Sequence, residues 1–450
     1  MGRSITTRRG PLPAPVVQAN DGNLTQFSGV VPLVRFMNEK LDIVRHLRRV
    51  AGHDGRSRRY APHLVLFAFV VGALTGVQRL AHLEWLRGDA VLLKFLRLPG
   101  WPVRKVFSGA LSRLTDGGVQ RLTDLVAEVG LAPLMGRSSA VVDMDSSAIV
   151  AFGTQEGAEF GYSGKGRNRR RHHPLVASVA ELRTVVHATY RDGSGIDANE
   201  AIEFAACAIG RVRAALASGA SVLLRADSGF WSNAFAAWLL DQAIPFIFAM
   251  PLRPGLKLML RTTRWRGLDQ DADIQVTVLP GAKLGIDARL QVVGIRRRVH
   301  DAKAPPQGKR IEGCTRWRYQ ALVTCMEGAP EDLWRFYNDR ADCERVFKTA
   351  RGALGMGWLV SQKLRANEAA FLLRLLAFNI DLRFQAHVEE EARREHRPLL
   401  RMGLCARQSR FYRAAGRLLR KSGQWILRVR DNRATERMWA FYAPELVALE

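Results

Sequence analysis

The sequence has 450 residues, 47% of them apolar, which is enough for the cores of two or three globular domains. Its 68 Lys and Arg residues outnumber 42 Asp and Glu residues, so the formal net charge is +26. Such a charge favours a polyanionic partner, nucleic acid first, and the spread of basic residues along the whole chain argues against a peripheral membrane protein.

The first region of the chain, up to about residue 138, is predicted to be helical. Apolar residues recur at spacings of three and four in Leu64–Trp85 and in Val119–Val129. The apolar stretch Leu64–Val77 is shorter than the roughly 20 residues of a membrane span, so we expect a buried helix there. Gly10–Asn20 is rich in proline and polar residues where a signal peptide has an apolar core. We therefore expect a cytoplasmic protein.

A change of pattern at Ser139 begins an alternation of predicted strands and helices. Segments rich in Val and Ile without Pro predict strands, and apolar residues at helical spacing predict helices. In chain order we predict strands Ala140–Val150, Leu175–Ala180 and Thr184–Tyr190, helix Asn199–Ala217, strand Ser221–Ala226, helix Ala234–Gln242 and strand Pro245–Met250. The segment Gly153–His173 is predicted to be a loop between the first two strands.

A long segment separates this alternation from the next predicted helix, which begins near Glu331. Three stretches in it, Ile274–Val278, Leu290–Val299 and Trp317–Thr324, have strand-like alternation. We therefore predict a β-rich insertion. From residue 360 onward the chain is predicted to be helical and strongly basic.

Two carboxylates fall on one face of the first predicted strand. The period of two in Val141–Ser147 places Asp143 and Asp145 on the same side. Because an isolated buried carboxylate is costly to desolvate, such residues usually have a positive partner or lie at a solvated site. This segment alone fits either ordinary surface acids on a strand edge or a functional site.

Asp227 directly follows the predicted strand Ser221–Ala226. Open α/β sheets place their ligands at the C-terminal ends of such strands. A structural role is the alternative, because an aspartate here can also cap the next helix or form a turn with Ser228 and Gly229.

A third candidate acid, Glu344, lies in a predicted helix over Trp334–Arg351. At about 100° per residue, one face of this helix gathers aromatic and charged side chains. They are Tyr337, Arg340, Glu344, Lys348 and Arg351. A solvated ion pair between Arg340 and Glu344, worth a few tenths of a kcal/mol, is the alternative, but it leaves Tyr337 unexplained.

Phosphodiester cleavage gives a reason for three separated acids. Two divalent cations about 4 Å apart can activate the attacking hydroxyl and stabilise the leaving oxygen, and Mg²⁺ favours carboxylates, water and phosphate as ligands. We predict that Asp145, Asp227 and Glu344 are catalytic and hold two Mg²⁺ ions, for which Mn²⁺ can substitute. Asp143 is the alternative first ligand. Basic residues on the helix face would then contact phosphate oxygens.

The ordered set of these elements resembles the DDE transposases of bacterial insertion sequences, whose catalytic domain has a ribonuclease-H-like fold. In that family the first aspartate lies on the first strand, the second just after the fourth, and the glutamate on a later helix. One subgroup has a β-rich insertion and the signature Tyr-x2-Arg-x3-Glu-x6-Lys, which Tyr337, Arg340 and Glu344 match. Arg351 replaces the final Lys, so either Arg351 or Lys348 takes the phosphate-contacting role.

Further residues carry the same resemblance. The subgroup's first aspartate is usually followed by a small residue and Thr, so Asp145-Ser146-Ser147 fits better than Asp143-Met144-Asp145. The stretches Gln155-Glu156-Gly157 and Gly161-Tyr162, followed by basic residues, are also similar to one branch of these enzymes.

The resemblance implies an α/β fold class: a ribonuclease-H-like mixed sheet flanked by helices, with a β-rich insertion and helical N- and C-terminal regions. It assigns residues 1–138 to a helical region that binds DNA ends, 139–250 and 330–359 to the catalytic core, 251–329 to the insertion, and 360–450 to a basic helical region.

Two further features are expected to contact DNA beside a metal site. The first is a basic loop, for which simple solvation is the alternative and whose phosphate contacts would be largely independent of sequence. Its members are Lys165, Arg167, Arg169, Arg170 and Arg171. The second is Trp231, which fits either stacking on an unpaired base or a place in the core.

By resemblance, the enzyme would bind the terminal inverted repeats of its own element, free a 3′ hydroxyl by hydrolysis and join it to another phosphodiester. We expect a homodimer or larger assembly on double-stranded DNA, at element ends and target, in the bacterial cytoplasm and on the nucleoid when bound. A metal-dependent nuclease without strand transfer and a catalytically inactive, transposase-derived DNA-binding protein are the alternatives.

Overall fold

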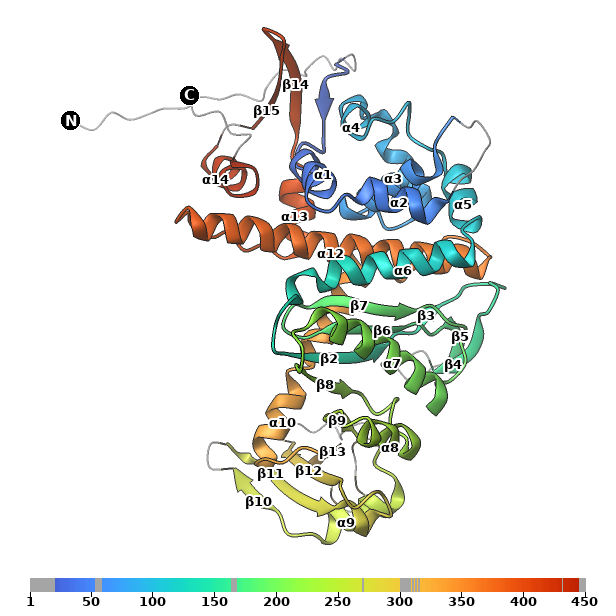
Figure 1. Cartoon of the computed structure of the whole chain (residues 1–450), viewed down its shortest axis with the longest axis vertical. Helices are drawn as coiled ribbons and strands as arrows, with labels where there is room; N and C mark the ends of the chain where they lie inside the picture. Colours follow the sequence, from blue (N-terminus) through green and yellow to red (C-terminus); the bar gives the residue numbers. More distant parts are fainter. Residues whose placement is uncertain are drawn as a thin grey trace, which may run out of the picture.

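The computed structural model describes residues 21–444, apart from 53–58, 163–167, 269–270, 300–308, 310, 312–313, 315 and 431. A nine-stranded mixed sheet in the order β10-β11-β12-β13-β9-β8-β2-β6-β7 runs through the lower part of the molecule, and a helical layer lies above it (Figure 1). The predicted fold class, a mixed sheet flanked by helices, is confirmed.

Five neighbouring strands form the half of the sheet that carries the predicted site. They are β2 (Ser139–Ser146), β6 (Leu175–Val179), β7 (Thr184–Thr189), β8 (Ser221–Ala226) and β9 (Phe246–Ala249). The first three pair antiparallel, whereas β8 is parallel to β2 and β9 is parallel to β8. Helix α7 (Ala198–Ala215) precedes β8, and α8 (Asn233–Asp241) follows it. This is the element order that the sequence predicts.

The β-rich segment continues the same sheet. It contains α9 (Pro254–Thr262), β10 (Arg266–Leu268), β11 (Asp271–Pro280), the 3-10 turn η3 (Gly281–Leu284), β12 (Gln291–Arg298) and β13 (Trp317–Thr324). Strand β13 pairs antiparallel with β9, with Leu322 opposite Ala249. The insertion strands therefore lie edge to edge with the strands of the predicted core.

The predicted loop Gly153–His173 is wrong in part, as is the single strand predicted over Ala140–Val150. The first strand ends at Ser146, and a separate sheet follows with the order β3-β5-β4. Its strands are β3 (Ile149–Val150), β4 (Glu159–Tyr162) and β5 (Asn168–His172). The cause is long-range pairing, because β5 pairs with both β3 and β4, which local patterning does not reveal.

The N-terminal and C-terminal regions share one hydrophobic core. The first contributes α1 (Val30–Glu39), α2 (Ile43–Ala51), α3 (Pro62–Leu74), η1 (Leu80–Gly88), α4 (Ala90–Leu96), α5 (Arg104–Ser112), α6 (Asp116–Leu131) and the turn η2 (Ala132–Leu134). The second contributes α12 (Leu364–Arg394), α13 (Leu404–Arg407), the π turn η5 (Gln408–Tyr412) and α14 (Arg433–Tyr442). As predicted, the apolar helix α3 is buried. In the described part of the chain no helix combines the length and apolar character that crossing a membrane requires.

The C-terminal region is not entirely helical, which corrects the prediction. A hairpin of β14 (Gly416–Lys421) and β15 (Gln424–Val429) pairs with the short strand β1 (Leu24–Thr25). Its turn places Ser422 at φ 50° and Gly423 at φ 82°, the positive values that a two-residue hairpin turn of type I′ needs. Basic residues on its strands hide the alternation that a hairpin usually displays.

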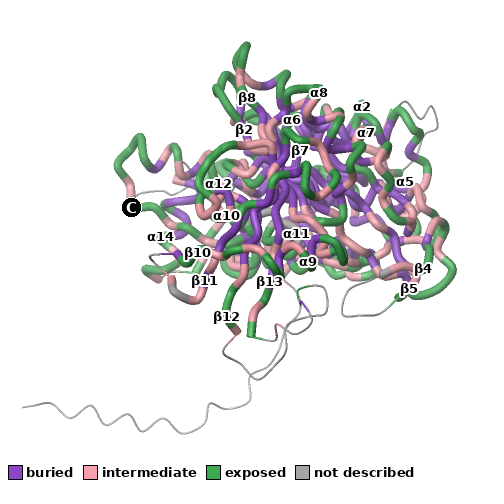
Figure 2. Tube along the Cα trace, turned by 90° about the horizontal axis from the view of Figure 1, so that it is seen from below, coloured by how far each residue is buried: buried purple, intermediate pink, exposed green. Residues whose placement is uncertain are grey.

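Helices α6 and α12 lie side by side between the helical layer and the sheet edge at β7 (Figure 1). Seen from below, the buried residues concentrate in the middle of the molecule (Figure 2). The fully buried Asn379 of α12 accepts a hydrogen bond from Val185 N at 2.9 Å. Its Nδ2 donates to Val126 O at 2.8 Å and to Val185 O at 2.7 Å. One amide thus joins α12, α6 and β7.

We expect Asn379→Leu to lower the free energy of unfolding by about 2 to 4 kcal/mol, because it leaves several buried backbone groups without a partner. Urea unfolding followed by circular dichroism measures the change. Asn233→Leu, at an exposed position of α8, is the control and should stay within about 0.5 kcal/mol of wild type. Equal stabilities of the two variants would contradict this role of Asn379.

Candidate functional site

Parallel pairing of β2 with β8 brings the two predicted aspartates together. Along this pair Asp143 lies opposite Arg225, and Met144 lies opposite Ala226. The next residue on each strand is a predicted ligand, Asp145 on β2 and Asp227 just beyond the end of β8. Asp227 also makes the turn that its sequence allowed, because its Oδ1 accepts from Gly229 N at 2.8 Å.

The helix predicted over Trp334–Arg351 is in fact two helices, α10 (Pro330–Asn338) and α11 (Ala341–Ala353). Between them Arg340 N donates to Tyr337 O at 3.1 Å, which tightens the end of α10 into a turn. The turn directs the Arg340 side chain at β2, where Nη2 donates to Met144 O at 3.1 Å. Glu344 follows in the first turns of α11, which packs against β2.

The three predicted acids line one cavity of about 550 Å³. Asp145 comes from β2, Asp227 from the end of β8 and Glu344 from α11. Three cations line the same cavity: Lys309, Arg318 and Arg340. Negative and positive groups thus line one cavity, which suits the binding of a phosphate group together with a metal cation.

Arg340 connects two of the acids. Its side chain is only 5% exposed, and its Nη2 lies 3.0 Å from Asp145 Oδ1. Its Nη1 lies 3.6 Å from Oε1 of Glu344, whose side chain is 69% exposed. A solvated ion pair between Arg340 and Glu344 alone therefore does not describe this contact, because the guanidinium is buried and also contacts Asp145.

Asp145 is electrostatically strained. Burial raises the pKa of its carboxyl to about 6; Arg340 opposes this rise, and the negative charges of Asp227 and Glu344 add to it. The carboxylate form is thus disfavoured in the folded chain, and an additional cation in the cavity would reverse that.

This shift makes a prediction about stability. The pKa of Asp145 in the folded chain lies above the ordinary value of 3.8 for an aspartate. Between about pH 4 and pH 6 the folded chain therefore binds more protons than the unfolded chain, and the free energy of unfolding falls as the pH rises through that window. Asp145→Asn lacks the ionisation. We expect it to match wild type near pH 4 and to exceed it by about 1 to 3 kcal/mol at pH 8.

The measurement is urea unfolding of both proteins across this pH range, with metals chelated. A variant less stable than wild type at pH 8 would show instead that the ion pair with Arg340 outweighs the burial of Asp145.

Asp143 has a different environment from Asp145. It is fully buried, and Arg225 binds it through two hydrogen bonds, Nε to Oδ1 at 2.7 Å and Nη2 to Oδ2 at 2.9 Å. Arg225 Nη1 also donates to Phe336 O of α10 at 2.6 Å. Asp143 does not line the acidic cavity. The geometry therefore favours Asp145 over the alternative first ligand and makes Asp143 part of the support for α10.

The remaining signature residues divide between core and surface. Tyr337 is 8% exposed, lines the cavity and packs with the cluster that includes Ile247 and Leu333; burial raises its pKa to about 12. Arg351 and Lys348 are both exposed, and Arg351 Nη2 donates to Ala148 O at 2.7 Å. Of the two residues considered for phosphate contact, Arg351 is thus the one that binds a backbone carbonyl.

Two predicted DNA contacts need correction because their side chains are buried. Arg171 is 8% exposed and lies beneath Gly161 of β4, and Trp231 is 8% exposed within the core of the sheet. Arg169 and Arg170 are partly exposed, with the Arg170 guanidinium 5.7 Å from the ring centre of Phe160. Lys165 and Arg167 lie outside the described residues.

Sequence reasoning missed three basic residues that belong to the site or its support. Arg225 had a detectable signal, since a guanidinium inside a buried strand needs an acid and Asp143 lies on a neighbouring strand. Arg318, exposed on β13, and Lys309 line the acidic cavity, and burial lowers the pKa of Lys309. No local pattern marks these two, because the insertion reaches the acids only in the folded chain, where β13, which carries Arg318, pairs with β9.

Within the described residues, no group of three or more His, Cys, Asp or Glu side chains forms a ready metal site. The acids nevertheless provide oxygen donors from three elements around one cavity. Carboxylate oxygens are the type of ligand that a divalent cation such as Mg²⁺ prefers. Arg340, between Asp145 and Glu344, is the group that such a cation would have to displace in part.

Comparison with known proteins gives one family match and a remote structural likeness. The family described as "Transposase DDE domain group 1" matches residues 14–440. None of the curated proteins matches the sequence. Among solved structures, the cryo-EM structure of a piggyBac transposase synaptic complex with hairpin DNA has a TM-score of 0.40 and 10% identity, over 86% of this chain and 85% of that chain.

Proposed function

The chain belongs to the group 1 family of DDE transposases, and on this premise we propose that it cuts DNA at the ends of its own element and joins the freed strands to target DNA. The observation that carries the proposal is the meeting of Asp145, Asp227 and Glu344 at one cavity that also has a basic lining. Residues far apart in the sequence converge there, and each has the chemistry that phosphodiester transfer requires.

The three acids are the proposed ligands of the catalytic cations. Transposases of the DDE family use divalent metal ions, and we propose two Mg²⁺ ions here, with Mn²⁺ as a substitute. When bound, such ions lower the pKa of the attacking water or hydroxyl and stabilise the leaving oxygen. Asp145, whose carboxyl interacts electrostatically with both Asp227 and Glu344, would hold the cations together with these two acids.

The basic residues around the cavity would hold the DNA strand. Arg318 and Lys309 extend from the insertion toward the cavity and are placed to bind phosphate oxygens, while Lys348 is available on α11. Arg340 contacts both Asp145 and Glu344. Its guanidinium, whose planar fork suits a phosphate oxygen, would be available to the DNA strand if a cation took its place beside these acids.

We further propose that residues 1–138 bind the terminal inverted repeats and that a homodimer or larger assembly holds both element ends. The net charge of +26 supports a large, salt-dependent contribution from phosphate contacts. The catalytic strands and α10–α11 would then receive the scissile strand from the bound end.

A cleavage and joining assay tests the proposal. Purified full-length protein is incubated with Mg²⁺, a duplex that carries the element end with its flank, and a supercoiled target. Cut ends and end-to-target joints are expected. Cutting without joints would support a nuclease without strand transfer, and end binding without cutting would support an inactive DNA-binding descendant; either outcome overturns the proposal.

A further inference from the structure

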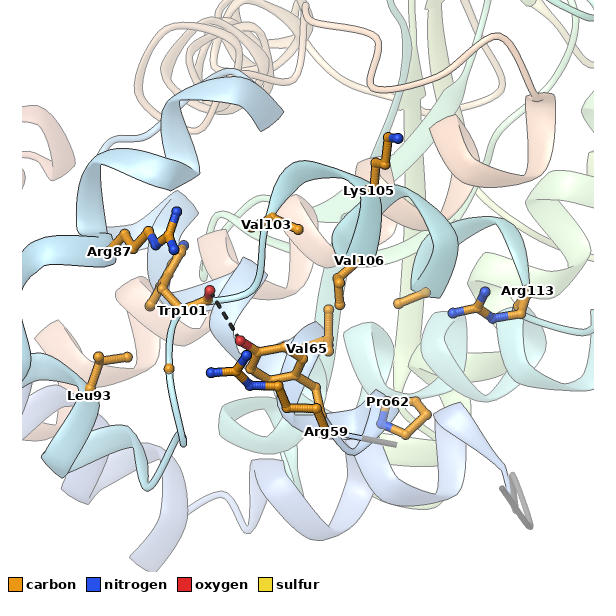
Figure 3. A pocket seen from close by; sticks show the side chains of 13 residues that line it. Arg59, Pro62, Val65, Arg87, Leu93, Trp101, Val103, Lys105, Val106 and Arg113 are labelled. Atoms are coloured by element: carbon orange, nitrogen blue, oxygen red, sulfur yellow. Dashed lines mark hydrogen bonds between the residues drawn. The ribbon is translucent and has the colours of Figure 1, made fainter. Parts of the chain in front are cut away.

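A second cavity, in the helical N-terminal region, differs in character from the acidic one and shares no lining residue with it. It lies between the start of α3, the end of η1, α4 and the start of α5, and it has a volume of about 700 Å³ (Figure 3). Sites for small organic ligands usually enclose about 300–1,000 Å³. The cavity is therefore large enough for a base with its sugar and phosphate.

The interior of this cavity is apolar. Val65, Trp101 and Ala110 are buried, and the partly buried Leu93 and Val106 complete the wall. Such a surface, open to solvent, gains free energy when a flat apolar group covers it.

The rim of the cavity is strongly basic. Exposed cations surround the opening, and none of the described lining residues is acidic. The cations are Arg59, Arg87, Lys105 and Arg113. Gathered like charges around a hollow repel one another and raise the local positive potential, so an anionic ligand is favoured.

Trp101 provides a third, independent feature. It is 3% exposed, and within the described part of the chain its indole N–H has no hydrogen-bond partner. Buried indole N–H groups usually have an acceptor, and one left without a partner is destabilising. A ligand that carries an acceptor on a flat ring would supply it.

Aromatic and guanidinium planes meet at the same place. The Tyr60 hydroxyl donates to Trp101 O at 3.4 Å, and the Arg59 guanidinium lies 5.6 Å from the centre of the Tyr60 ring. Planar groups of this kind stack on nucleic-acid bases without requiring a particular sequence.

We propose that this cavity binds one nucleotide, with its base against the apolar interior, a base acceptor at the Trp101 N–H and its phosphate at the basic rim. The source we favour is an unpaired nucleotide of a DNA strand held by the helical region. That choice of source rests on the proposed transposase function, whereas the chemistry of the cavity does not.

The test measures binding of the full-length chain to labelled DNA by fluorescence anisotropy, at physiological salt and with metals chelated. Two probes differ only at one end: a blunt duplex, and the same duplex with a short unpaired overhang. A deoxynucleoside monophosphate is the unlabelled competitor. We expect the overhang to bind about tenfold more tightly than the blunt end, which corresponds to the stacking of about one base.

Trp101→Phe keeps the apolar ring and removes the N–H, so we expect it to reduce the preference for the overhang by about fivefold or more. Trp439→Phe is the matched control, because Trp439 is also buried with an unpartnered indole N–H but does not line the cavity. It should keep the wild-type preference. Equal preferences in the two variants would overturn the proposal.

A second pair of variants tests the rim with exposed residues only. The rim variant combines Arg59→Gln, Arg87→Gln and Lys105→Gln. Its control combines Arg253→Gln, Arg261→Gln and Lys283→Gln, which removes the same charges from exposed positions elsewhere. The rim variant should lose the overhang preference, and the control should lose only general affinity. The same loss in both would overturn the proposal.

The competitor identifies the source. Displacement of the overhang probe only by DNA with unpaired ends supports a strand nucleotide, while displacement by micromolar monophosphate supports the nucleotide site and assigns it a free nucleotide. Absence of any overhang preference together with no competition by monophosphate overturns it. Because no cleavage is measured, these outcomes are independent of whether the acidic cavity is catalytic.

Discussion

Replacement of Asp145, Asp227 or Glu344 by its neutral amide is expected to lower DNA cleavage by at least about 1,000-fold, the size expected when several kcal/mol of metal-ion stabilisation are removed. The variants are Asp145→Asn, Asp227→Asn and Glu344→Gln. Each keeps the shape of the side chain and removes one ligand charge from the acidic cavity. Single-turnover cleavage of the end-containing duplex with Mg²⁺ measures the effect.

End binding should persist in all three variants, because the acids repel phosphate rather than attract it. Asp241→Asn is the matched control, since Asp241 is 69% exposed at the end of α8 and does not line the acidic cavity. It should cleave at the wild-type rate within about twofold. Persistent cleavage by Asp227→Asn or Glu344→Gln would exclude that residue as a ligand, and persistent cleavage by Asp145→Asn would return Asp143 to consideration.

The second large effect concerns folding rather than chemistry. We expect Asp143→Asn to lower the free energy of unfolding by about 3 to 5 kcal/mol, because it leaves the Arg225 guanidinium buried without its counter-charge. The side chains of Arg225 and Asp143 are only 2% and 0% exposed, so water cannot replace the lost partner. Urea unfolding at pH 7 measures the loss.

A double variant separates the loss of the counter-charge from the loss of side-chain packing. Asp143→Leu combined with Arg225→Met replaces the buried pair by apolar groups of similar volume, which is often neutral in proteins. It should be more stable than Asp143→Asn, although Phe336 O loses the donor that Arg225 provides. Asp241→Asn should again change stability by less than about 0.5 kcal/mol. A stable, folded and inactive Asp143→Asn protein would contradict the structural role of Asp143 and make it a catalytic candidate.

Loss of cleavage is expected at Asp145 and loss of stability at Asp143. The sequence alone could not assign these roles to the two aspartates of one strand. Alternation correctly places Asp143 and Asp145 on one face of β2, but that pattern carries no information on what faces them. Arg225 on β8 covers the first, and the turn between α10 and α11 leaves the second open to the cavity. Both neighbours come from segments distant in the sequence.

The fold was predictable where local patterns and chain order sufficed. The strands and helices from Ser139 to Ala249 and the order of the three acids follow from apolar periodicity. Three features did not follow from these patterns. The small sheet of β3, β4 and β5 depends on pairing between separate segments. Basic residues hide the alternation of the β14–β15 hairpin, and the break at Asp339 and Arg340 is a local turn inside a helical periodicity. Tertiary contacts also bury Arg171, although its segment is strongly basic, and they place Trp231 in the core, which is one of the two alternatives that the sequence left open.

Direct measurement of metal binding tests the central claim, that Asp145, Asp227 and Glu344 together hold the catalytic cations. Mn²⁺ is titrated into the DNA-bound full-length protein, and the amount of bound Mn²⁺ is measured by electron paramagnetic resonance. We expect wild-type protein to bind Mn²⁺ and each of Asp145→Asn, Asp227→Asn and Glu344→Gln to bind it at least about tenfold more weakly, while Asp241→Asn binds it as wild type does. Unchanged Mn²⁺ affinity in the three cavity variants would contradict the account.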